Sequence, residues 1–402
     1  MRILLIDVNC KENSTGKLVY QIYNYLLHND DEAYICYGRG IKIKENGIYK
    51  FGLDLETYLH ALFTRITGFT GCFSLLSTIR LIKYIEKVKP DIVHIHEIHG
   101  YFVNIDHLLK YLSSKKIPVV LTLHCEFMYT GKCGYAIDCN NWKIGCGDCP
   151  RISDYPKSLY FDNTRKMFSK KIKAINMIEK IIITTVSPWL YDRAKLSYIK
   201  DKDIRIVLNG IDNENIFFYQ KKELIRDKLN IPQDKYILLS VAQNIVERSG
   251  KEIAKIAKEL PDIEFYLIGS GEKKDYFRDN MHLVGCIKDQ PTLAQYYSSA
   301  DLFLLCSKKE TFSMPCAESI CCGTPVVGYE AGGPEGIFKE PYASFVRYGD
   351  VNAMVNLIKL KLKSNISCED LMIYGNRFSN KNMCKNYNDI YRELLDRYGE
   401  GK

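Results

Sequence analysis

The clearest pattern in the chain is ADLFLLCSKKETFSMPCAESICCGTPVV, which spans residues 300–327. Its apolar run at 302–305 is short and uninterrupted, which is typical of a buried strand in a parallel sheet. Ser313 is a residue type that caps helices, and Pro315 suits a first helical turn, where a missing N–H costs nothing. We therefore predict a strand, a loop and a helix, which is the repeating unit of α/β folds.

Two carboxylates flank this predicted helix start. Glu310 stands in the loop, and Glu318 stands about one turn into the helix. The N–H groups at a helix start carry a partial positive charge and bind phosphate. A diphosphate beside two acceptors for hydroxyl groups is what a nucleotide-sugar site requires. The alternative is a helix with two solvated glutamates.

The rest of the chain repeats the alternation of strand and helix, in two series. The first series of predicted strands lies at 3–8, 92–95, 119–123 and 181–186. The second lies at 204–208, 236–241, 264–268, 302–305 and 325–328. This alternation predicts two Rossmann-like domains with parallel sheets. We place them at residues 1–200 and 201–379, followed by a C-terminal helix within 380–402.

The size and composition of the chain fit an enzyme of two α/β domains. The 402 residues exceed one ordinary core, and 46% of them are hydrophobic. No run of apolar residues is long enough for a membrane span, and the first strand is too short for a signal peptide, so we expect a cytoplasmic protein. The net charge of +8 fits nucleic acid, anionic lipid or a phosphorylated substrate, and charge alone does not choose among them.

Three segments resemble one known family. Residues 310–327 resemble the E-x7-E motif of retaining GT-B glycosyltransferases of family 4, and 209–212 (Asn-Gly-Ile-Asp) matches a turn of that family. Residues 122–160 resemble a subgroup that builds bacterial exopolysaccharide, colanic-acid-like, capsular and O-antigen (lipopolysaccharide) units. The resemblance implies a GT-B fold, in which two Rossmann-like domains face a central cleft and the C-terminal helix crosses back to the first domain.

The resemblance also implies roles in binding the donor. Glu318 would accept hydrogen bonds from ribose hydroxyls and Glu310 from sugar hydroxyls. The other implied donor contacts are the amides of Thr311, Phe312 and Ser313 at the distal phosphate, Gly16 at the diphosphate and Gly269 near the base. The family's usual Arg and Lys are absent, since Gln243 and Ser249 stand near their positions. We therefore assign the phosphate contacts to Arg248 and Lys251, whose alternative role is that of solvated loop cations.

A histidine ends the third predicted strand. In the resembled family a His at the position of His124 hydrogen-bonds the transferred sugar, and His96 and His99 are candidates to line the same cleft. Family members often have Asp where Cys125 stands, so one polar contact is expected to be missing. The alternative for His124 is a structural histidine with satisfied hydrogen bonds.

Four of the fifteen cysteines fall within a Cys-rich insertion at about 125–160. They are Cys133, Cys139, Cys146 and Cys149. Four thiolates at this spacing, ending in C-x-x-C among glycines, can surround a tetrahedral zinc ion. Buried free thiols are the alternative, and we expect a structural zinc. No metal is expected for the chemistry itself.

These patterns together predict a hexosyltransferase-type glycosyltransferase. It would move a sugar from a UDP- or GDP-sugar to a saccharide or polyprenyl-diphosphate-linked acceptor, with retention. Three alternatives share the fold: a nucleotide-sugar epimerase, a sugar phosphorylase and a non-catalytic nucleotide-sugar-binding protein. We expect no nucleic-acid partner, because a zinc-dependent nucleic-acid binder would not need the pair Glu310 and Glu318.

Residues 58–81 are rich in apolar and aromatic side chains and carry Arg65 and Arg80. A second basic stretch follows at Arg165, Lys166, Lys170, Lys171 and Lys173. Basic helices with an apolar face can lie in a membrane interface, so we expect peripheral attachment to the inner face of the cytoplasmic membrane, through anionic lipid. Core helices with solvated charges are the alternative.

Overall fold

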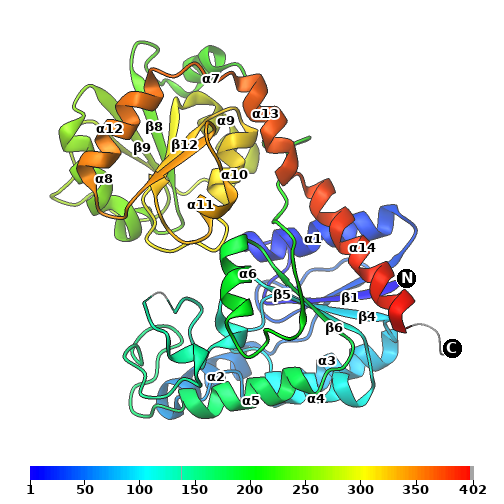
Figure 1. The fold of residues 1–402 in the computed structure, drawn as a ribbon. Coiled ribbons are helices and arrows are strands. Elements are labelled where there is room, and N and C mark those ends of the chain that lie inside the picture. The colour runs from blue at the N-terminus through cyan, green and yellow to red at the C-terminus, as the bar shows by residue number, and fades with distance from the viewer. Residues whose placement is uncertain (137, 399–402) are drawn as a thin grey trace. The chain divides into compact units, whose positions relative to one another are not determined.

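The computed structural model describes residues 1–136 and 138–398. The chain forms two compact units, and the chain returns to the first after completing the second (Figure 1). The N-terminal unit comprises Met1–Leu208 and Met383–Lys402, and the C-terminal unit comprises Asn209–Asn382. Each unit is described by itself.

The N-terminal unit is built on a parallel sheet with the strand order β3-β2-β1-β4-β5-β6-β7. The strands are β1 (Arg2–Asp7), β2 (Glu32–Tyr37), β3 (Ile48–Lys50), β4 (Ile92–Ile95), β5 (Val119–Leu123), β6 (Ile181–Thr185) and β7 (Asp203–Ile206). The three neighbouring strands β4, β5 and β6 are buried along their whole length. Apart from His94 in β4, their residues are apolar or β-branched, and these strands form the centre of the core.

One predicted strand belongs to the other sheet. We predicted 204–208 as the first strand of the second series, but β7 pairs in parallel with β6, with Ile183 opposite Ile204. The short helix α6 (Pro188–Lys195) connects the two strands, so β7 adds to the edge of the N-terminal sheet. A short strand–helix–strand connection places consecutive parallel strands side by side.

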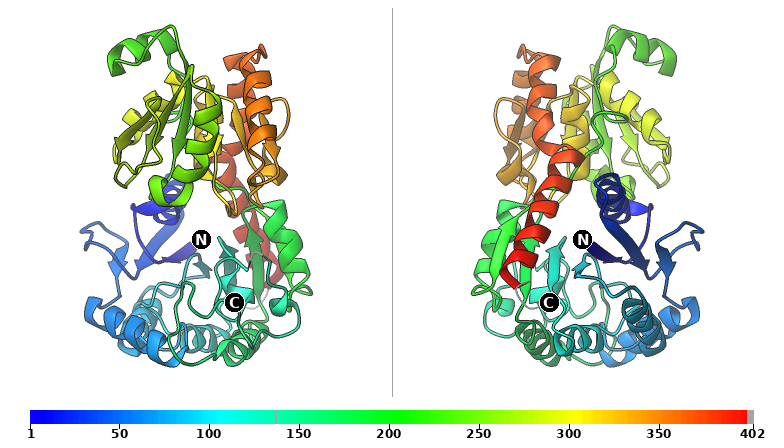
Figure 2. Two further views of the ribbon diagram at one scale, coloured as in Figure 1. Left: turned by 90° about the vertical axis from the view of Figure 1, so that its left-hand side faces the viewer. Right: turned by 90° about the vertical axis from the view of Figure 1, so that its right-hand side faces the viewer.

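Helices cover both faces of this sheet (Figures 1 and 2). One face carries α3 (Leu75–Val88), α4 (Ile105–Ser114) and α5 (Thr164–Asn176), and the other carries α1 (Asn13–His28) and α14 (Asn380–Tyr398). Helix α2 (Asp54–Thr67) precedes α3, and two short 3-10 turns, Phe127–Tyr129 and Asn141–Lys143, lie in the Cys-rich insertion.

Helix α14 contributes to the core of the N-terminal unit although it ends the chain. The Tyr391 hydroxyl lies 2.6 Å from Nδ1 of His94, and the Tyr387 hydroxyl lies 3.1 Å from Oγ1 of Thr122. Both tyrosines are fully buried. Arg205 of β7 also forms a two-pronged ion pair with Glu393. Apolar burial and paired polar groups together fix the helix to the sheet.

The C-terminal unit has a second parallel sheet, with the order β10-β9-β8-β11-β12-β13. The strands are β8 (Tyr236–Val241), β9 (Ile263–Ile268), β10 (Met281–Gly285), β11 (Leu302–Leu305), β12 (Val326–Tyr329) and β13 (Ala343–Val346). The helices are α7 (Lys222–Leu229), α8 (Lys251–Glu259), α9 (Gln290–Ser299), α10 (Met314–Cys321), α11 (Pro334–Ile337), α12 (Val351–Leu362) and α13 (Cys368–Gly375). Buried side chains of α8 and α12 share one core cluster with those of β9 and β11.

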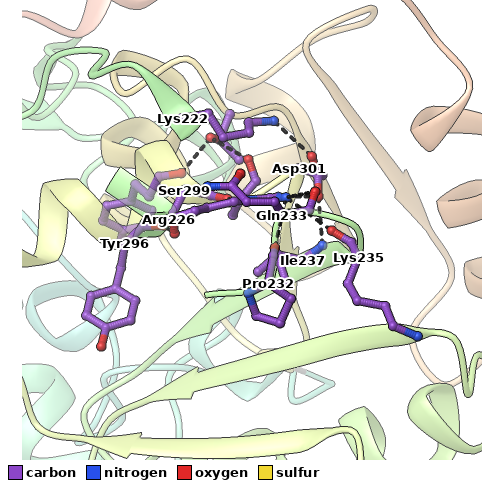
Figure 3. A network of polar contacts seen from close by, with 12 residues as sticks. Lys222, Arg226, Pro232, Gln233, Lys235, Ile237, Tyr296, Ser299 and Asp301 are labelled. Atoms are coloured by element: carbon purple, nitrogen blue, oxygen red, sulfur yellow. Dashed lines mark hydrogen bonds and ion pairs between the residues drawn. The ribbon is translucent and has the colours of Figure 1, made fainter. Parts of the chain in front are cut away.

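A buried ion-pair network holds α7 against this sheet (Figure 3). Arg226 of α7 is 4% exposed and lies 2.7 Å from a carboxylate oxygen of Asp301, which precedes β11. The same Asp301 accepts from Lys222 at 2.9 Å and from the N–H of Ile237 in β8 at 2.7 Å. One carboxylate thereby joins α7, β8 and the start of β11.

None of the helices in the described part of the chain is both long and apolar enough to cross a membrane.

Candidate functional site

The predicted strand, loop and helix around Glu310 are confirmed as β11, a loop and α10. The loop is held at Glu310, whose N–H donates to the carbonyl of Ala331 and whose carbonyl accepts from Gly333, both at 2.9 Å. These two hydrogen bonds tie the loop after β11 to the loop after β12. Because carboxyl ends of parallel strands meet at one edge of a sheet, Glu310 lies where open α/β sheets bind ligands.

The Glu310 side chain is 20% exposed, and its Oε1 lies 3.3 Å from Nη2 of Arg248. Burial raises the pKa of Glu310 above its ordinary value, although the Arg248 guanidinium and a hydrogen bond with Ser307 act in the opposite direction. Glu310 is thus a largely buried acceptor with one cation beside it. Sequence reasoning did not find this ion pair, because the two residues lie far apart in the chain.

Ser313 corrects one prediction. It occupies the N-cap position of α10 in a left-handed conformation (φ 71°), and its side chain makes no capping hydrogen bond. Its hydroxyl instead lies 3.2 Å from the sulfur of Cys316. The Ser313 hydroxyl therefore does not cap the first N–H groups of α10. Pro315 lies in the first turn, as predicted.

Glu318 lies within α10 and is half-buried. Its Oε2 accepts a hydrogen bond of 2.9 Å from the hydroxyl of Tyr297 in α9. Tyr297 is fully buried, and burial together with the Glu318 carboxylate raises the pKa of its phenol well above the ordinary value, so the phenol stays a donor. Tyr297 was missed by the sequence analysis, and no local pattern marks it.

Arg248 lies in a π-helical turn, Val246–Gly250, that leads into α8. Such turns are rare and occur frequently at functional sites. The turn brings Arg248 to Glu310, whereas Ser249 is 3% exposed and carries no charge. Lys251, the first residue of α8, is exposed. Of the two predicted phosphate contacts, Arg248 is therefore the one that the structure brings to Glu310.

Gly269 follows β9 with φ 150°, and a Cβ here would lie 1.9 Å from the carbonyl oxygen of Ala242. Only glycine allows this approach. The next residue, Ser270, donates through its hydroxyl to the Gln243 carbonyl and to Oδ1 of Asn244, both at 2.6 Å. The loops after β8 and β9 are thereby joined at the sheet edge that also carries Glu310.

In the N-terminal unit, Gly16 is buried in the first turn of α1 and packs against the backbone of Asn9 and Cys10. The preceding Thr15 donates to Asp7 at 3.1 Å. Asp7 is fully buried at the end of β1, and burial raises its pKa to about 7, against hydrogen bonds from backbone N–H groups. Asp7 was not among the predicted site residues, since it reads in the sequence as a strand end.

His124 follows β5, and its Nε2 lies 3.0 Å from Nδ1 of His96, which follows β4. Burial lowers the pKa of His124 to about 4 and that of His96 well below its ordinary value. Both imidazoles are therefore neutral at pH 7, and one donates its N–H to the other. The structure brings these two predicted residues together at the carboxyl edge of the N-terminal sheet.

His99, Glu97 and Cys125 form a group beside this pair. His99 forms an ion pair with Glu97, and the Cys125 sulfur lies 3.7 Å from a Glu97 oxygen. Burial lowers the pKa of His99, but the Glu97 carboxylate outweighs burial and raises it. Cys125, where an Asp is common in the resembled family, thus contacts an acid from another strand end. Sequence reasoning missed Glu97.

The four predicted zinc ligands, Cys133, Cys139, Cys146 and Cys149, line a single cavity of the N-terminal unit. None of them forms a disulfide.

Two family models match the chain. The model of glycosyltransferase family 4 matches residues 16–215, and the model of the glycosyl transferases group 1 matches residues 221–378. The chain is 19% identical to WcaC of Escherichia coli (strain K12), over 98% of this chain and 100% of that protein. WcaC is named, by inference, as a colanic acid biosynthesis glycosyl transferase. It is 22% identical to an uncharacterized protein in the cps region of Klebsiella pneumoniae, over 78% of this chain and 81% of that protein.

Solved structures share the fold. Sucrose-phosphate synthase from Thermosynechococcus elongatus aligns with a TM-score of 0.70 and 16% identity, over 99% of this chain and 100% of that chain. HepE of Anabaena in complex with UDP-glucose aligns with a TM-score of 0.63 and 14% identity, over 99% of this chain and 100% of that chain. Together with the two family models, these findings show that the chain is a glycosyltransferase of the GT-B fold and belongs to glycosyltransferase family 4.

Proposed function

We propose that this glycosyltransferase uses a UDP- or GDP-sugar as donor, transfers a hexose and retains the configuration at the anomeric carbon. The observation that supports this best is the pair Glu310 and Glu318 on either side of the start of α10, a helix start without a side-chain cap. The HepE structure, which is named as a complex with UDP-glucose, supports a nucleotide-sugar donor.

In this proposal the C-terminal unit binds the donor. Tyr297 orients Glu318 to accept from the ribose hydroxyls, and the buried Glu310 accepts from the hydroxyls of the sugar. The amides of Thr311, Phe312 and Ser313 face the distal phosphate. Arg248 supplies the positive charge that Ser249 lacks. Preorganised N–H dipoles and a guanidinium stabilise the charge that develops on the leaving diphosphate.

As the bond between the anomeric carbon and the diphosphate oxygen breaks, the acceptor oxygen bonds to that carbon from the same face. Its proton passes to the leaving phosphate, so the configuration is retained. The neutral His124 contacts the transferred sugar, and Gly16 and Gly269 let the backbone approach the diphosphate and the base. Lys251, which is exposed at the start of α8, also remains a proposed phosphate contact. No metal ion is required by these steps.

We further propose that the acceptor is a polyprenyl-diphosphate-linked saccharide in the synthesis of a bacterial surface polysaccharide. The names of two relatives, which refer to colanic acid and to a cps region, support a capsular or exopolysaccharide product. A lipid-linked acceptor would be presented at a membrane surface. The enzyme would then need a surface that binds the membrane, and the N-terminal unit has a candidate.

That surface carries an apolar patch on α2, α3 and a neighbouring loop. Its exposed members are Leu55, Tyr58, Leu59, Leu62, Phe63, Ile66, Leu75, Leu76, Ile79, Leu159, Tyr160 and Phe161. The loop is tied to α2 by the N–H of Leu159, which donates to the carbonyl of Arg65 at 2.7 Å. Glu56 of α2 in turn accepts from the N–H of Leu76 at 2.8 Å, so the three segments adjoin.

Exposed cations border this patch, among them Arg65, Lys166 and Lys170. Lys171 corrects the predicted basic stretch, because it is 6% exposed and points into the protein, where it contacts Phe127. An apolar surface bordered by cations is suited to anionic lipid. We propose that the patch attaches the enzyme peripherally to the inner face of the cytoplasmic membrane.

The transfer is tested with a panel of UDP- and GDP-sugars, each incubated with lipid-linked saccharide acceptors, and the anomeric configuration of the product is read by NMR. We expect one donor to be consumed only with acceptor present, with retention. Conversion of the donor without any acceptor would indicate an epimerase, and dependence on free phosphate would indicate a phosphorylase. Binding of a donor without turnover under any condition would contradict transfer.

A further inference from the structure

The Cys-rich insertion gathers its four cysteines around one small cavity. Cys133, Cys139, Cys146 and Cys149 all contribute to its wall, together with the fully buried Trp142. The volume is about 20 Å³, which is room for one water-sized sphere. The thiols of Cys133 and Cys149 interact directly, and all four cysteines are free of disulfides. The cavity therefore has the size and the ligands for a single metal ion.

The backbone around Cys146 is bent in a way that ordinary side chains avoid. Gly145, Cys146, Gly147 and Asp148 are consecutive residues with positive φ, of 133°, 53°, 100° and 47°. Positive φ at Cys146 and Asp148 costs energy and persists only where other contacts hold it. The sulfur of Cys146 accepts the N–H of Gly131 at 3.1 Å, and that of Cys149 accepts the N–H of Arg151. Hydrogen bonds from backbone N–H groups stabilise a sulfur that carries negative charge.

Two buried ammonium groups adjoin the cavity. Lys132 is 1% exposed and donates to the carbonyls of Ile152, Asp154 and Pro156, at 2.7, 2.7 and 2.8 Å. Lys171 is 6% exposed and contacts the carbonyl and the ring of Phe127. Within the described residues, neither lysine takes part in an ion pair. Lys132 lies within electrostatic reach of Asp154 and Asp162, and burial lowers the pKa of Lys171 to about 7. Buried ammonium groups are stabilised by nearby negative charge, which thiolates in the cavity would supply.

A zinc–thiolate centre in the cavity would place negative charge beside both lysines. Zinc bound by four thiolates carries a net charge of about −2, which two ammonium groups balance. Lys132 lies within electrostatic reach of Cys133 and Cys149, and Lys171 within reach of Cys133 and Cys146. The two lysines are thus placed to balance the charge of such a centre.

We infer that Cys133, Cys139, Cys146 and Cys149 bind one structural zinc ion as thiolates, with Lys132 and Lys171 balancing its charge. This metal has no part in sugar transfer. It holds the insertion together and keeps the bent segment 145–148 in place. Among the described residues, the group whose ligand atoms all lie within 4.8 Å of one another is Glu97, His99 and Cys125, not the four cysteines. Zinc binding at the cavity therefore requires the four sulfur atoms to move closer together.

The first test measures the metal in the whole protein, purified under reducing conditions and supplied with zinc. We expect about one zinc per chain, with X-ray absorption showing only sulfur neighbours at about 2.3 Å. A shell of mixed nitrogen, oxygen and sulfur would place the ion at Glu97, His99 and Cys125 and overturn the proposal. Protein that takes up no zinc and has four reactive thiols here would also overturn it.

The second test compares variants. Cys146→Ser should lose zinc, and a chelator should then no longer lower its melting temperature. Cys72→Ser is the matched control, since Cys72 is a half-buried thiol of the same unit outside the cavity. Lys171→Met should retain the four ligands and bind zinc at least tenfold more weakly. Full zinc in Cys146→Ser, or unchanged zinc affinity in Lys171→Met together with Lys132→Met, would contradict the assignment.

Discussion

Glu310 and Glu318 stand close together in the sequence but are held by different partners. A guanidinium lies 3.3 Å from Glu310, whereas a buried phenol donates to Glu318. The first carboxylate is therefore part of a charged pair in a loop, and the second is a rigid acceptor on a helix. This difference separates what each substitution should do.

We expect Glu310→Gln to lose turnover while the affinity for nucleotide largely survives, and Glu318→Ala to weaken nucleotide binding itself. Each lost hydrogen bond to a ligand hydroxyl should cost about 1 kcal/mol or more, which is roughly fivefold. Steady-state kinetics and calorimetric titration with UDP or GDP measure the two effects. Glu259→Gln, at the exposed end of α8, is the control. Near-wild-type transfer by both Glu310→Gln and Glu318→Ala would contradict the roles proposed for these two carboxylates.

The buried histidines of the N-terminal unit predict a loss of stability in acid. Burial lowers the pKa of His124 to about 4, and it lowers those of His94 and His96 well below the ordinary value, near 6.5. Between pH 6.5 and 4 the unfolded chain thus binds more protons, so the free energy of unfolding falls as the pH falls. His99 and Asp7 act in the opposite direction, because Glu97 raises the pKa of His99 and burial raises that of Asp7 to about 7. The three histidines together outweigh these two groups.

We expect denaturant unfolding at a series of pH values to show that the free energy of unfolding decreases between pH 6.5 and 4. In His96→Gln this decrease should be smaller than in the wild type. The substitution removes one group that is neutral in the folded state and charged in the acid-unfolded state. His28→Gln is the control, since His28 is exposed at the end of α1. An identical pH dependence in wild type and His96→Gln would show that the folded imidazole is not kept neutral.

The sequence predicted which residues of the site are acids, but not what holds them. Glu310 and Glu318 could be placed because strand, loop and helix follow from local pattern. Tyr297 was not predicted, and Arg248 was predicted as a phosphate contact but not as the partner of Glu310, since both reach the carboxylates from other elements. Ser313 was assigned the role of a cap from its residue type, and the left-handed backbone at that position overrides the preference.

At the scale of elements, Asp301 joins α7, β8 and β11 through three hydrogen-bonded partners. We expect Asp301→Asn to destabilise the C-terminal unit by about 3–5 kcal/mol, because Arg226 would stay buried without its counter-charge. Lys222→Ala is the matched control, since Lys222 is more exposed and should cost far less. Thermal unfolding and limited proteolysis measure the change, and equal effects of the two substitutions would contradict this account.

The central strands could be predicted from their apolar runs, whereas several outer strands could not. Strand β3 has three residues, and β10 is mostly half-buried, so neither presents a continuous apolar run. The order of strands within a sheet also depends on pairing across the chain. This is why β7 could be predicted as a strand but was assigned to the wrong sheet.

For the whole molecule, the net charge of +8 and the apolar patch predict binding to membranes that depends on both charge and apolar contact. We expect co-sedimentation with anionic vesicles at low salt, weaker binding at high salt, and little binding to neutral vesicles, since each cation near an anionic surface adds about 1 kcal/mol.

The double variant Leu62→Ser with Phe63→Ser should lose most of this binding. Leu224→Ser with Ile373→Ser is its matched control, because these exposed apolar residues belong to the C-terminal unit, outside the patch. If neither vesicle type carries down the wild type at any salt concentration, the patch does not bind lipid and a soluble acceptor becomes the better proposal.

The return of the chain to the N-terminal unit sets an order on biosynthesis. The strands of that sheet are translated before residues 209–382, whereas Tyr387, Tyr391 and Leu394, which are buried in its core, are translated after them. Until these side chains emerge, His94 and Thr122 lack their phenol partners, and α1 alone covers the face that α14 shares with it. Residues 209–382, by contrast, are continuous and can fold as soon as they are made. The N-terminal unit is thus begun before the C-terminal unit and completed after it.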